Sequence, residues 1–298
     1  MNRCLTIATV FILILTLSGF GQSRRNNRGD SIEGTVLSVI ASRADKNSGP
    51  IRVEDLFLYE NGVEQRIKNF APDPSPSRIM ILVDNSQTLP APIETLKKAV
   101  MEFAYEIFEG DQLFVLAYDE KAEIVQEWTD DAKKIQASLE TFRKKGNPNL
   151  FDALEISMKE VLLPLMPGTR KTAVVLVGDG VDRGSKATFD KVLADYQNQD
   201  VTIYALQLAD RTGGAYRRDQ PKATAVMTRL AEETGGKVFP FEEAQAAAKA
   251  ICDELRANRY LLSYLPTNAT SFDSRRLLLT ASDGISIRMK AVQPPNIK

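Results

Sequence analysis

The central part of the chain alternates between short apolar runs and longer segments in which apolar residues recur at helical spacing. In residues 91–109 the apolar positions fall on one face at intervals of three and four, which predicts an amphipathic helix. Strands that alternate with such helices predict a doubly wound α/β domain with a mostly parallel sheet over residues 78–258. The expected strands are 78–84, 111–119, 122–128, 172–179, 201–208 and 237–241, and the expected helices are 91–109, 131–144, 150–163, 187–198, 222–234 and 243–257.

The segments on both sides of this domain have a β pattern instead. Residues 32–70 are rich in β-branched residues and contain two runs joined at Asn61-Gly62, a dipeptide typical of tight hairpins. Residues 259–298 again contain strands, two of them around Asp283-Gly284. Because an isolated hairpin is only marginally stable, we predict one small β domain that both flanks build together, with the α/β domain inserted into it.

Two further segments complete the expected organisation. The first 21 residues combine a short basic start, an apolar run from Leu5 to Leu17 and small residues at the end, which is the layout of a secretory signal peptide. Residues 22–31 are polar and basic and are expected to form a flexible leader. The proline-rich segment 71–77 is expected to be a stiff linker between the β and α/β domains.

These features predict an exported protein, located in the periplasm, in the cell envelope or outside the cell. The apolar run of the signal peptide is too short to span a bilayer comfortably, and no later segment is apolar enough, so we expect no membrane span in the mature chain. The formal net charge of −1 gives no support to nucleic-acid binding.

The residue inventory restricts the chemistry. The chain has no histidine, which excludes Ser-His-Asp and Cys-His nucleophile systems and the usual zinc sites. Cleavage of the signal peptide would leave Cys252 as the only cysteine, and we expect it to be a buried, small apolar side chain. Any metal site must therefore use carboxylate, hydroxyl and amide oxygens.

Such oxygens follow two of the predicted strands. Asp84 ends an apolar strand and is followed at alternate positions by Ser86 and Thr88, while Asp179 ends a second apolar strand. In an open doubly wound sheet, ligands bind beyond the carboxyl ends of the strands, where the strand order reverses. Oxygen ligands suit Mg²⁺, Mn²⁺ or Ca²⁺. The alternative is that these residues cap the next helix or satisfy the loop backbone; Asp152, early in a helix, is expected to be structural in this way.

The stretches "ILVDNSQT", "VVLVGDG", "NLFDAL" and "LAEETGGKVFPF" resemble the von Willebrand factor A-type domain, whose metal-ion-dependent adhesion site begins with Asp-x-Ser-x-Ser/Thr. The flanking stretches "VEDLFLYENGVEQRIKNF" and "YLLSYLPTN" are similar to exported proteins of this type known chiefly from acidobacteria. The resemblance implies that a divalent cation, Mg²⁺ or else Mn²⁺ or Ca²⁺, is held directly by Ser86 and Thr88 and partly through water by Asp84 and Asp179. One departure is Pro148, which stands where the family usually supplies a threonine ligand.

Three functions follow as hypotheses. The first is a non-enzymatic binding module that engages a protein or another carboxylate-bearing ligand through the cation. The second is a metal-independent scaffold in a cell-envelope complex, which Pro148 favours. The third is a Mg²⁺-dependent phosphatase of the haloacid-dehalogenase type; it is the weakest, because Ser86 stands where those enzymes need a second aspartate as general acid.

Overall fold

The computed structural model describes residues 34–45, 49–166, 170–209, 218–267 and 273–295. The predicted signal peptide (1–21) and leader (22–31) lie outside the described residues. In the described ranges, every helix is too short or too polar to cross a lipid bilayer.

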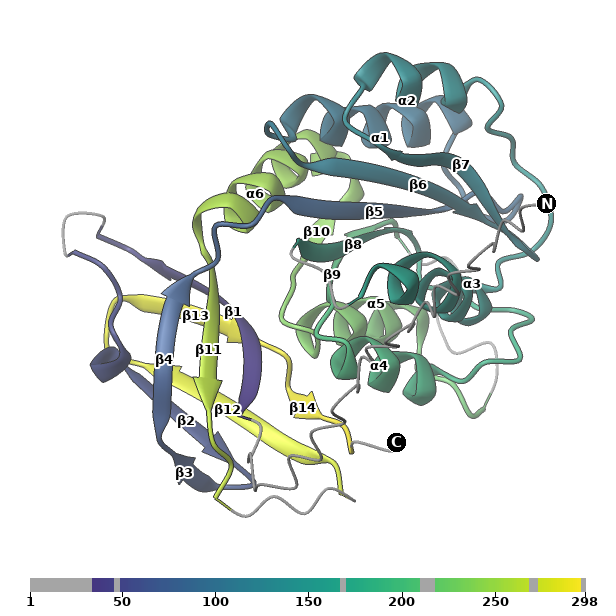
Figure 1. Ribbon diagram of the computed structural model, residues 1–298. Coiled ribbons are helices and arrows are strands. Elements are labelled where there is room, and N and C mark those ends of the chain that lie inside the picture. Colours follow the sequence, from purple (N-terminus) through teal and green to yellow (C-terminus); the bar gives the residue numbers. More distant parts are fainter. Residues whose placement is uncertain (1–33, 46–48, 167–169, 210–217, 268–272, 296–298) are drawn as a thin grey trace, which may run out of the picture. The chain divides into compact units, whose positions relative to one another are not determined.

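The α/β domain is built on a six-stranded sheet in the order β10-β9-β8-β5-β6-β7 (Figure 1). Neighbouring strands are parallel except β7, which runs antiparallel to β6 at one edge. The predicted doubly wound, mostly parallel sheet is confirmed. The strands are β5 (Ser77–Asp84), β6 (Gln112–Tyr118), β7 (Ala122–Thr129), β8 (Lys171–Gly178), β9 (Thr202–Gln207) and β10 (Val238–Pro240).

Helices of the described ranges cover both faces of this sheet. On one face α1 (Ile93–Glu106), α2 (Ala132–Leu139) and α6 (Ala244–Ala257) share a core with the sheet, and on the other face α3 (Leu150–Ile156), α4 (Phe189–Asn198) and α5 (Ala223–Glu232) do so. Strand β5 explains why the apolar runs are continuous: Ile79, Ile81 and Val83 belong to the first core, and Met80 and Leu82 to the second. In a strand that is buried on both faces, every side chain packs in a core, so the strand sequence is continuously apolar.

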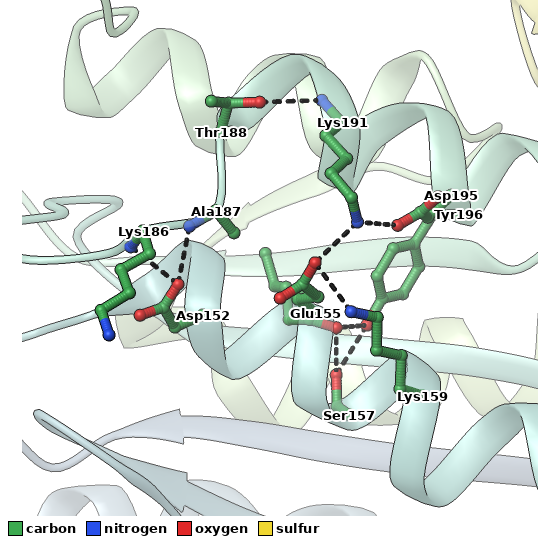
Figure 2. Close-up of polar contacts among 11 residues, drawn as sticks. Asp152, Glu155, Ser157, Lys159, Lys186, Ala187, Thr188, Lys191, Asp195 and Tyr196 are labelled. Atoms are coloured by element: carbon green, nitrogen blue, oxygen red, sulfur yellow. Dashed lines mark hydrogen bonds and ion pairs between the residues drawn. The ribbon is translucent and has the colours of Figure 1, made fainter.

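The helix predicted over 150–163 is not uniform. After α3 the backbone continues as a π-helix (Ser157–Leu162) and then a 3₁₀ turn (Leu163–Leu165). Figure 2 shows polar contacts that join this segment to α4, among them a 2.7 Å hydrogen bond between the buried hydroxyls of Ser157 and Tyr196. The Lys191 ammonium contacts Glu155 and Asp195 at 2.6 and 2.9 Å. These contacts fix α3 and α4 side by side beneath the loops that precede them.

Both flanks build one β domain, as the sequence predicts. One sheet has the order β13-β1-β11-β4, the other β14-β12-β2-β3, and both are antiparallel around one shared hydrophobic core. Each sheet combines strands from both ends of the chain, so neither flank can complete a sheet alone. The strands are β1 (Thr35–Arg43), β2 (Leu56–Glu60), β3 (Val63–Gln65), β4 (Ile67–Pro72), β11 (Arg259–Tyr264), β12 (Arg275–Ala281), β13 (Ile285–Met289) and β14 (Val292–Gln293), and a 3₁₀ turn (Val53–Asp55) precedes β2.

The turns at Asn61-Gly62 and at Asp283-Gly284 connect their strands differently. At Asn61-Gly62 the backbone has φ values of 49° and 82°, and β2 pairs with β3 across this turn. At Asp283-Gly284 the two expected strands are present, but they do not pair with each other. Strand β12 pairs with β2, whereas β13 pairs with β1, so the turn carries the chain from one sheet to the other. The apolar residues of the two strands then face each other across the core instead of lying on one sheet.

The proline-rich linker is shorter than the predicted 71–77, because β4 extends through Pro72 and β5 begins at Ser77. The intervening residues are held in place. The Asp73 carboxylate accepts hydrogen bonds from the backbone and hydroxyl of Ser75, and the Asp73 amide donates to the carbonyl of Arg259. The linker is therefore a fixed connection, consistent with its stiffness.

Cys252 lies on α6 and is 2% exposed, as predicted. Burial raises the pKa of its thiol to about 12, and the nearby acidic residues Asp111, Glu106 and Asp253 raise it further. Since the thiolate is the reactive species, we expect Cys252 to resist a thiol-specific reagent in the native protein at pH 8 and to react only after unfolding. The measurement is the rate of colour release with a disulfide reagent, with and without guanidinium chloride. Rapid reaction of the native protein would contradict this burial.

Candidate functional site

The loops that follow β5 and β8 lie side by side at the carboxyl edge of the sheet, and the site between them is called the crevice. These strands are neighbours, with Val83 opposite Val177, so Asp84 at the end of β5 and Asp179 just after β8 come together. The loop after β5 leads to α1 on one face, and the loop after β8 leads to α4 on the other. This divergence marks the reversal of strand order at which open α/β sheets bind ligands.

A glycine allows the two strand ends to approach closely. A Cβ atom at Gly178 would lie 3.2 Å from the Cβ of Asp84 and 3.1 Å from the hydroxyl of Tyr118. Contacts this short are tighter than ordinary side-chain packing permits. Gly178 therefore leaves the space beside the Asp84 carboxylate that a larger residue would fill.

The first loop places three oxygen-bearing side chains in sequence. Asp84 is fully buried, and its Oδ1 accepts a 2.8 Å hydrogen bond from the amide of Ser86. The hydroxyls of Ser86 and Thr88 lie 3.2 Å apart, and Thr88 is exposed to solvent. The Asp84 Oδ2 is buried and has no hydrogen-bond partner among the described residues. A buried carboxylate oxygen without a partner is costly, and it is the feature expected of a missing ligand.

The electrostatics of Asp84 agree with this description. Burial raises the pKa of Asp84 to about 7, and the charge of Asp179 adds to the increase. The hydrogen bonds from Ser86 and the positive charge of Lys144 act in the opposite direction. Burial raises the pKa of Tyr118 well above its ordinary value, and the charges of Asp84, Asp179 and Asp182 raise it further. A cation placed here would relieve the repulsion between the two aspartates.

The second loop, residues 143–149, is tied to the first loop by backbone and side-chain hydrogen bonds. The amide group of Asn85 donates to the carbonyl of Arg143, and the backbone amide of Lys145 donates to the carbonyl of Asn85. The Lys144 ammonium donates to the carbonyls of Leu89 and Ala91. Both loops thus form one wall of the crevice, and Lys144 brings a positive charge close to Asp84.

Pro148 offers no side-chain oxygen, and the amide nitrogens of its two neighbours are engaged elsewhere. Pro148 is buried, and its carbonyl accepts a 2.8 Å hydrogen bond from the amide of Arg183. The Asn147 and Asn149 amide groups donate to the side chain and carbonyl of Glu120, respectively, at 3.4 and 3.3 Å. Both asparagines are therefore engaged on the side of the loop where Glu120 lies.

The third loop, after β8, is organised by acidic side chains that bind backbone amides. Asp179 Oδ1 accepts from the amide of Val181 at 3.0 Å. Asp152 on α3 accepts from the amides of Lys186 and Ala187, as Figure 2 shows, so its predicted structural role agrees with these contacts. Asp152 thereby connects α3, which follows the second loop, to the third loop.

Four residues of this edge escaped the sequence reasoning. Asp119 directly follows β6 and is buried, Asp182 is buried in the third loop, and Tyr118 and Lys144 surround Asp84. A signal for Asp119 was present, because the run "DQLFVLAYD" also ends on an aspartate at the same edge of the sheet. Asp182 is already occupied by Phe151, Ser185 and Gln220 through hydrogen bonds, which indicates a structural role.

The donor set of the crevice suits a hard cation with partial hydration. Across the described ranges, no three Asp, Glu or Cys side chains come together in a way that could hold a metal ion by themselves. A cation here would depend on the hydroxyls of Ser86 and Thr88 together with Asp84 and Asp179. Such oxygen ligands are those of Mg²⁺, which keeps several waters in protein sites.

These observations define a class of domain. It is an open, doubly wound α/β domain with acidic and hydroxyl side chains at the point where the strand order reverses. Residues 79–181 match the family model of the von Willebrand factor type A domain. The resemblance read from the sequence is thus confirmed over these residues, which lie in the α/β domain. Membership of the acidobacterial group stays a prediction.

Several solved structures are similar to this chain at low sequence identity. An aerotolerance-related membrane protein from Bacteroides fragilis is 17% identical, with 60% of this chain and 98% of that chain covered and a TM-score of 0.47. Proximal thread matrix protein 1 from the mussel byssus, with a zinc-occupied MIDAS motif, is 14% identical over 65% and 48% of the two chains, with a TM-score of 0.46. A von Willebrand factor type A protein from Catenulispora acidiphila is 9% identical over 83% and 76%, with a TM-score of 0.49. No curated protein matches the chain.

Proposed function

We propose that this protein is an exported, non-enzymatic binding module that engages a carboxylate-bearing ligand, most simply an acidic side chain of a partner protein, through a divalent cation. The observation that carries the proposal is the buried Oδ2 of Asp84, which has no hydrogen-bond partner in the part of the chain that the structure describes, beside the ends of β5 and β8. The type A domain is generally an interaction module, which agrees with this role.

The proposed ligands of the cation are Ser86 and Thr88, with Asp84 and Asp179 contributing directly or through water. When bound, the cation supplies a positive centre that a carboxylate of the partner can reach. The protein's own residues bury Asp84, orient Ser86 through the Asp84 carboxylate, and leave Thr88 at the solvent side. Because two of the four ligands are neutral hydroxyls and Mg²⁺ keeps several waters, a carboxylate of the partner can replace one of those waters.

The position of Pro148 limits how tightly a cation can bind. The site lacks the oxygen that the family usually supplies there, and Asn147 and Asn149 are engaged by Glu120. Water can fill an open position in a Mg²⁺ site, since this ion is reluctant to lose its hydration shell. We therefore expect weak binding that a carboxylate from the partner strengthens.

The test is calorimetric titration of the mature chain with Mg²⁺ and with Mn²⁺. We expect saturable binding that Asp84→Ala abolishes and that Asp130→Asn, a change of an exposed acid far from the crevice, leaves intact. Loss of affinity in the first variant follows because it removes a charged ligand. Equal binding by Asp84→Ala and the unchanged protein would show that the cation sits elsewhere.

A metal-independent scaffold is the second candidate, and one observation favours it. The Lys144 charge already lowers the pKa of Asp84, so this lysine partly takes the place of a cation. If calorimetry shows no cation binding and an added acetate or acidic peptide does not restore it, the scaffold is the better account. The phosphatase hypothesis gains nothing from this crevice, because Ser86 stands at the position of the required general acid.

A further inference from the structure

A cavity of about 470 Å³ lies at the amino edge of the same sheet, where the β domain adjoins the starts of β5 and β8. It is separate from the proposed cation crevice, because Arg78 and Asp84 lie six residues apart along β5, or roughly 20 Å in an extended strand. Four basic side chains line it. They are Arg78 on β5, Arg170 before β8, Lys171 on β8 and Arg259 on β11.

None of these four cations forms an ion pair with an acidic group of the described chain. Their hydrogen bonds and aromatic contacts are to uncharged groups instead. Arg170 donates to the carbonyl of Gly110 at 2.5 Å, and Lys171 donates to the carbonyl of Asp73 at 2.9 Å. Arg259 donates to the hydroxyl of Thr202 at 2.7 Å, and the Arg78 guanidinium lies 5.8 Å from the centre of the Trp128 ring.

The acids beside the cavity are occupied by other groups. Asp200 accepts a 2.6 Å hydrogen bond from the amide of Ser38, and its other oxygen lies 3.4 Å from the ammonium of Lys290. Asp73 binds both the amide and the hydroxyl of Ser75. The cavity therefore keeps an excess of positive charge.

Burial makes this excess of positive charge energetically unfavourable. Arg259 is 3% exposed and Lys171 is 6% exposed, and the Nε atoms of Arg259 and Arg78 are buried without a hydrogen-bond partner in the described part of the chain. Burial lowers the pKa of Lys171, where the charges of Asp73 and Asp111 oppose this effect and the charge of Arg259 adds to it. Burial also lowers the pKa of Arg78, and the charge of Arg170 lowers it further. A buried charge without a counter-ion is unfavourable, whereas an anion would satisfy both the charges and the free N–H groups.

We propose that this cavity binds a phosphate group, either as free phosphate or as the phosphate of a small organic molecule. Guanidinium groups bind the oxygens of phosphate through paired N–H donors, and three of the four cations here are arginines. The cavity has a volume in the range of small-molecule sites, which leaves room for an organic part attached to the phosphate. The binding would also hold the β domain and the α/β domain together, because Arg259 comes from one and the other three from the other.

The experiment is titration of the full mature chain with inorganic phosphate and with glycerol 3-phosphate, followed by calorimetry and by the thermal unfolding midpoint. Sodium chloride at matched ionic strength is the reference. We expect saturable one-to-one binding of at least one phosphate compound and a midpoint that rises with its concentration. Tighter binding of glycerol 3-phosphate would identify an organic phosphate as the ligand class, and tighter binding of inorganic phosphate would identify the free ion.

The matched variants are Arg78→Gln and Arg170→Gln, which are half-buried, with Arg66→Gln as an exposed control outside the cavity. We expect phosphate affinity to fall by about tenfold or more in the first two, since each loses a charge-assisted contact, and to be unchanged in the third. Asp84→Asn should also leave it unchanged, which separates this site from the cation crevice. Responses to phosphate no larger than to chloride, or equal in all variants, would overturn the proposal.

Discussion

Replacing Asp84 with asparagine is expected to stabilise the folded protein in neutral and alkaline solution when divalent cations are removed by a chelator. In the folded chain, burial raises the pKa of this carboxyl to about 7, far above its ordinary value of 3.8. The folded state therefore holds the proton more tightly than the unfolded state does. Stability contributed by the protonated form is present at low pH and is lost as the pH rises toward 7.

The size of this effect follows from the shift. Between pH 5 and pH 8 the ionisation of Asp84 should lower the free energy of unfolding by about 3 kcal/mol, since one pKa unit corresponds to about 1.4 kcal/mol. Asparagine cannot ionise, and its side-chain oxygen can still accept from the amide of Ser86. The free energy of unfolding of the variant should therefore not fall in this way as the pH rises.

The measurement is urea denaturation of both proteins at pH 5 and pH 8 in the presence of a chelator. The stability difference between Asp84→Asn and the unchanged protein should grow in favour of the variant as the pH increases. Adding Mg²⁺ at pH 8 should reverse part of the difference, because only the unchanged protein keeps the charged ligand. A difference that does not vary with pH would mean that Asp84 is not buried as a costly carboxylate.

Replacing Gly180 with alanine is expected to be severely destabilising and to displace the loop that carries Asp179. Gly180 has a φ of 81°, and a Cβ atom there would lie 2.3 Å from the backbone carbonyl oxygen of Ala223 at the start of α5. Backbone cannot move away as a flexible side chain can. We expect the free energy of unfolding to fall by about 3 kcal/mol or more, because steric overlap adds to the cost of the left-handed backbone.

A matched control is available in Gly62, which has nearly the same φ, 82°, and nothing within 4 Å of the position of a Cβ atom. Gly62→Ala should lower the free energy of unfolding by only about 1 to 2 kcal/mol, the cost of placing alanine in the left-handed region. Chemical denaturation of both variants gives the comparison, and calorimetry shows whether Gly180→Ala also loses cation binding. Equal losses of stability in the two variants would show that the loop after β8 can shift away from α5 without cost.

The elements of the α/β domain could be predicted from the sequence because their signals are local. The continuous apolar run of β5 indicates a strand covered on both faces, and the apolar spacing of α1 indicates a helix covered on one. The pairing of the flanks was harder. The strands on either side of Asp283-Gly284 were recognised, but their partners, β1 and β2, lie more than 200 residues away. A turn signal alone does not decide which sheet the next strand joins.

For the candidate site, too, the sequence predicted the local features and missed those that depend on packing. The sequence indicated Asp84, Ser86, Thr88 and Asp179, because polar residues directly follow buried strands. It did not indicate that Lys144 stands close enough to Asp84 to influence its charge, or that Asn147 and Asn149 are engaged by Glu120. These are properties of how three loops from distant segments pack together.

The sequence by itself determined the kind of domain and the oxygen-bearing side chains at the ends of two strands. Periodicity and strand-end residues are local signals, because they depend on residues close together in the chain. Only the tertiary structure decided the energies of two groups of charges. Among the described residues, the buried Oδ2 of Asp84 has no partner at one edge of the sheet, and four cations from separate segments have no ion-pair partner at the other. The physical reason is that desolvation and the lack of a counter-ion depend on which groups surround a charge, and the chain assembles those groups only when it folds.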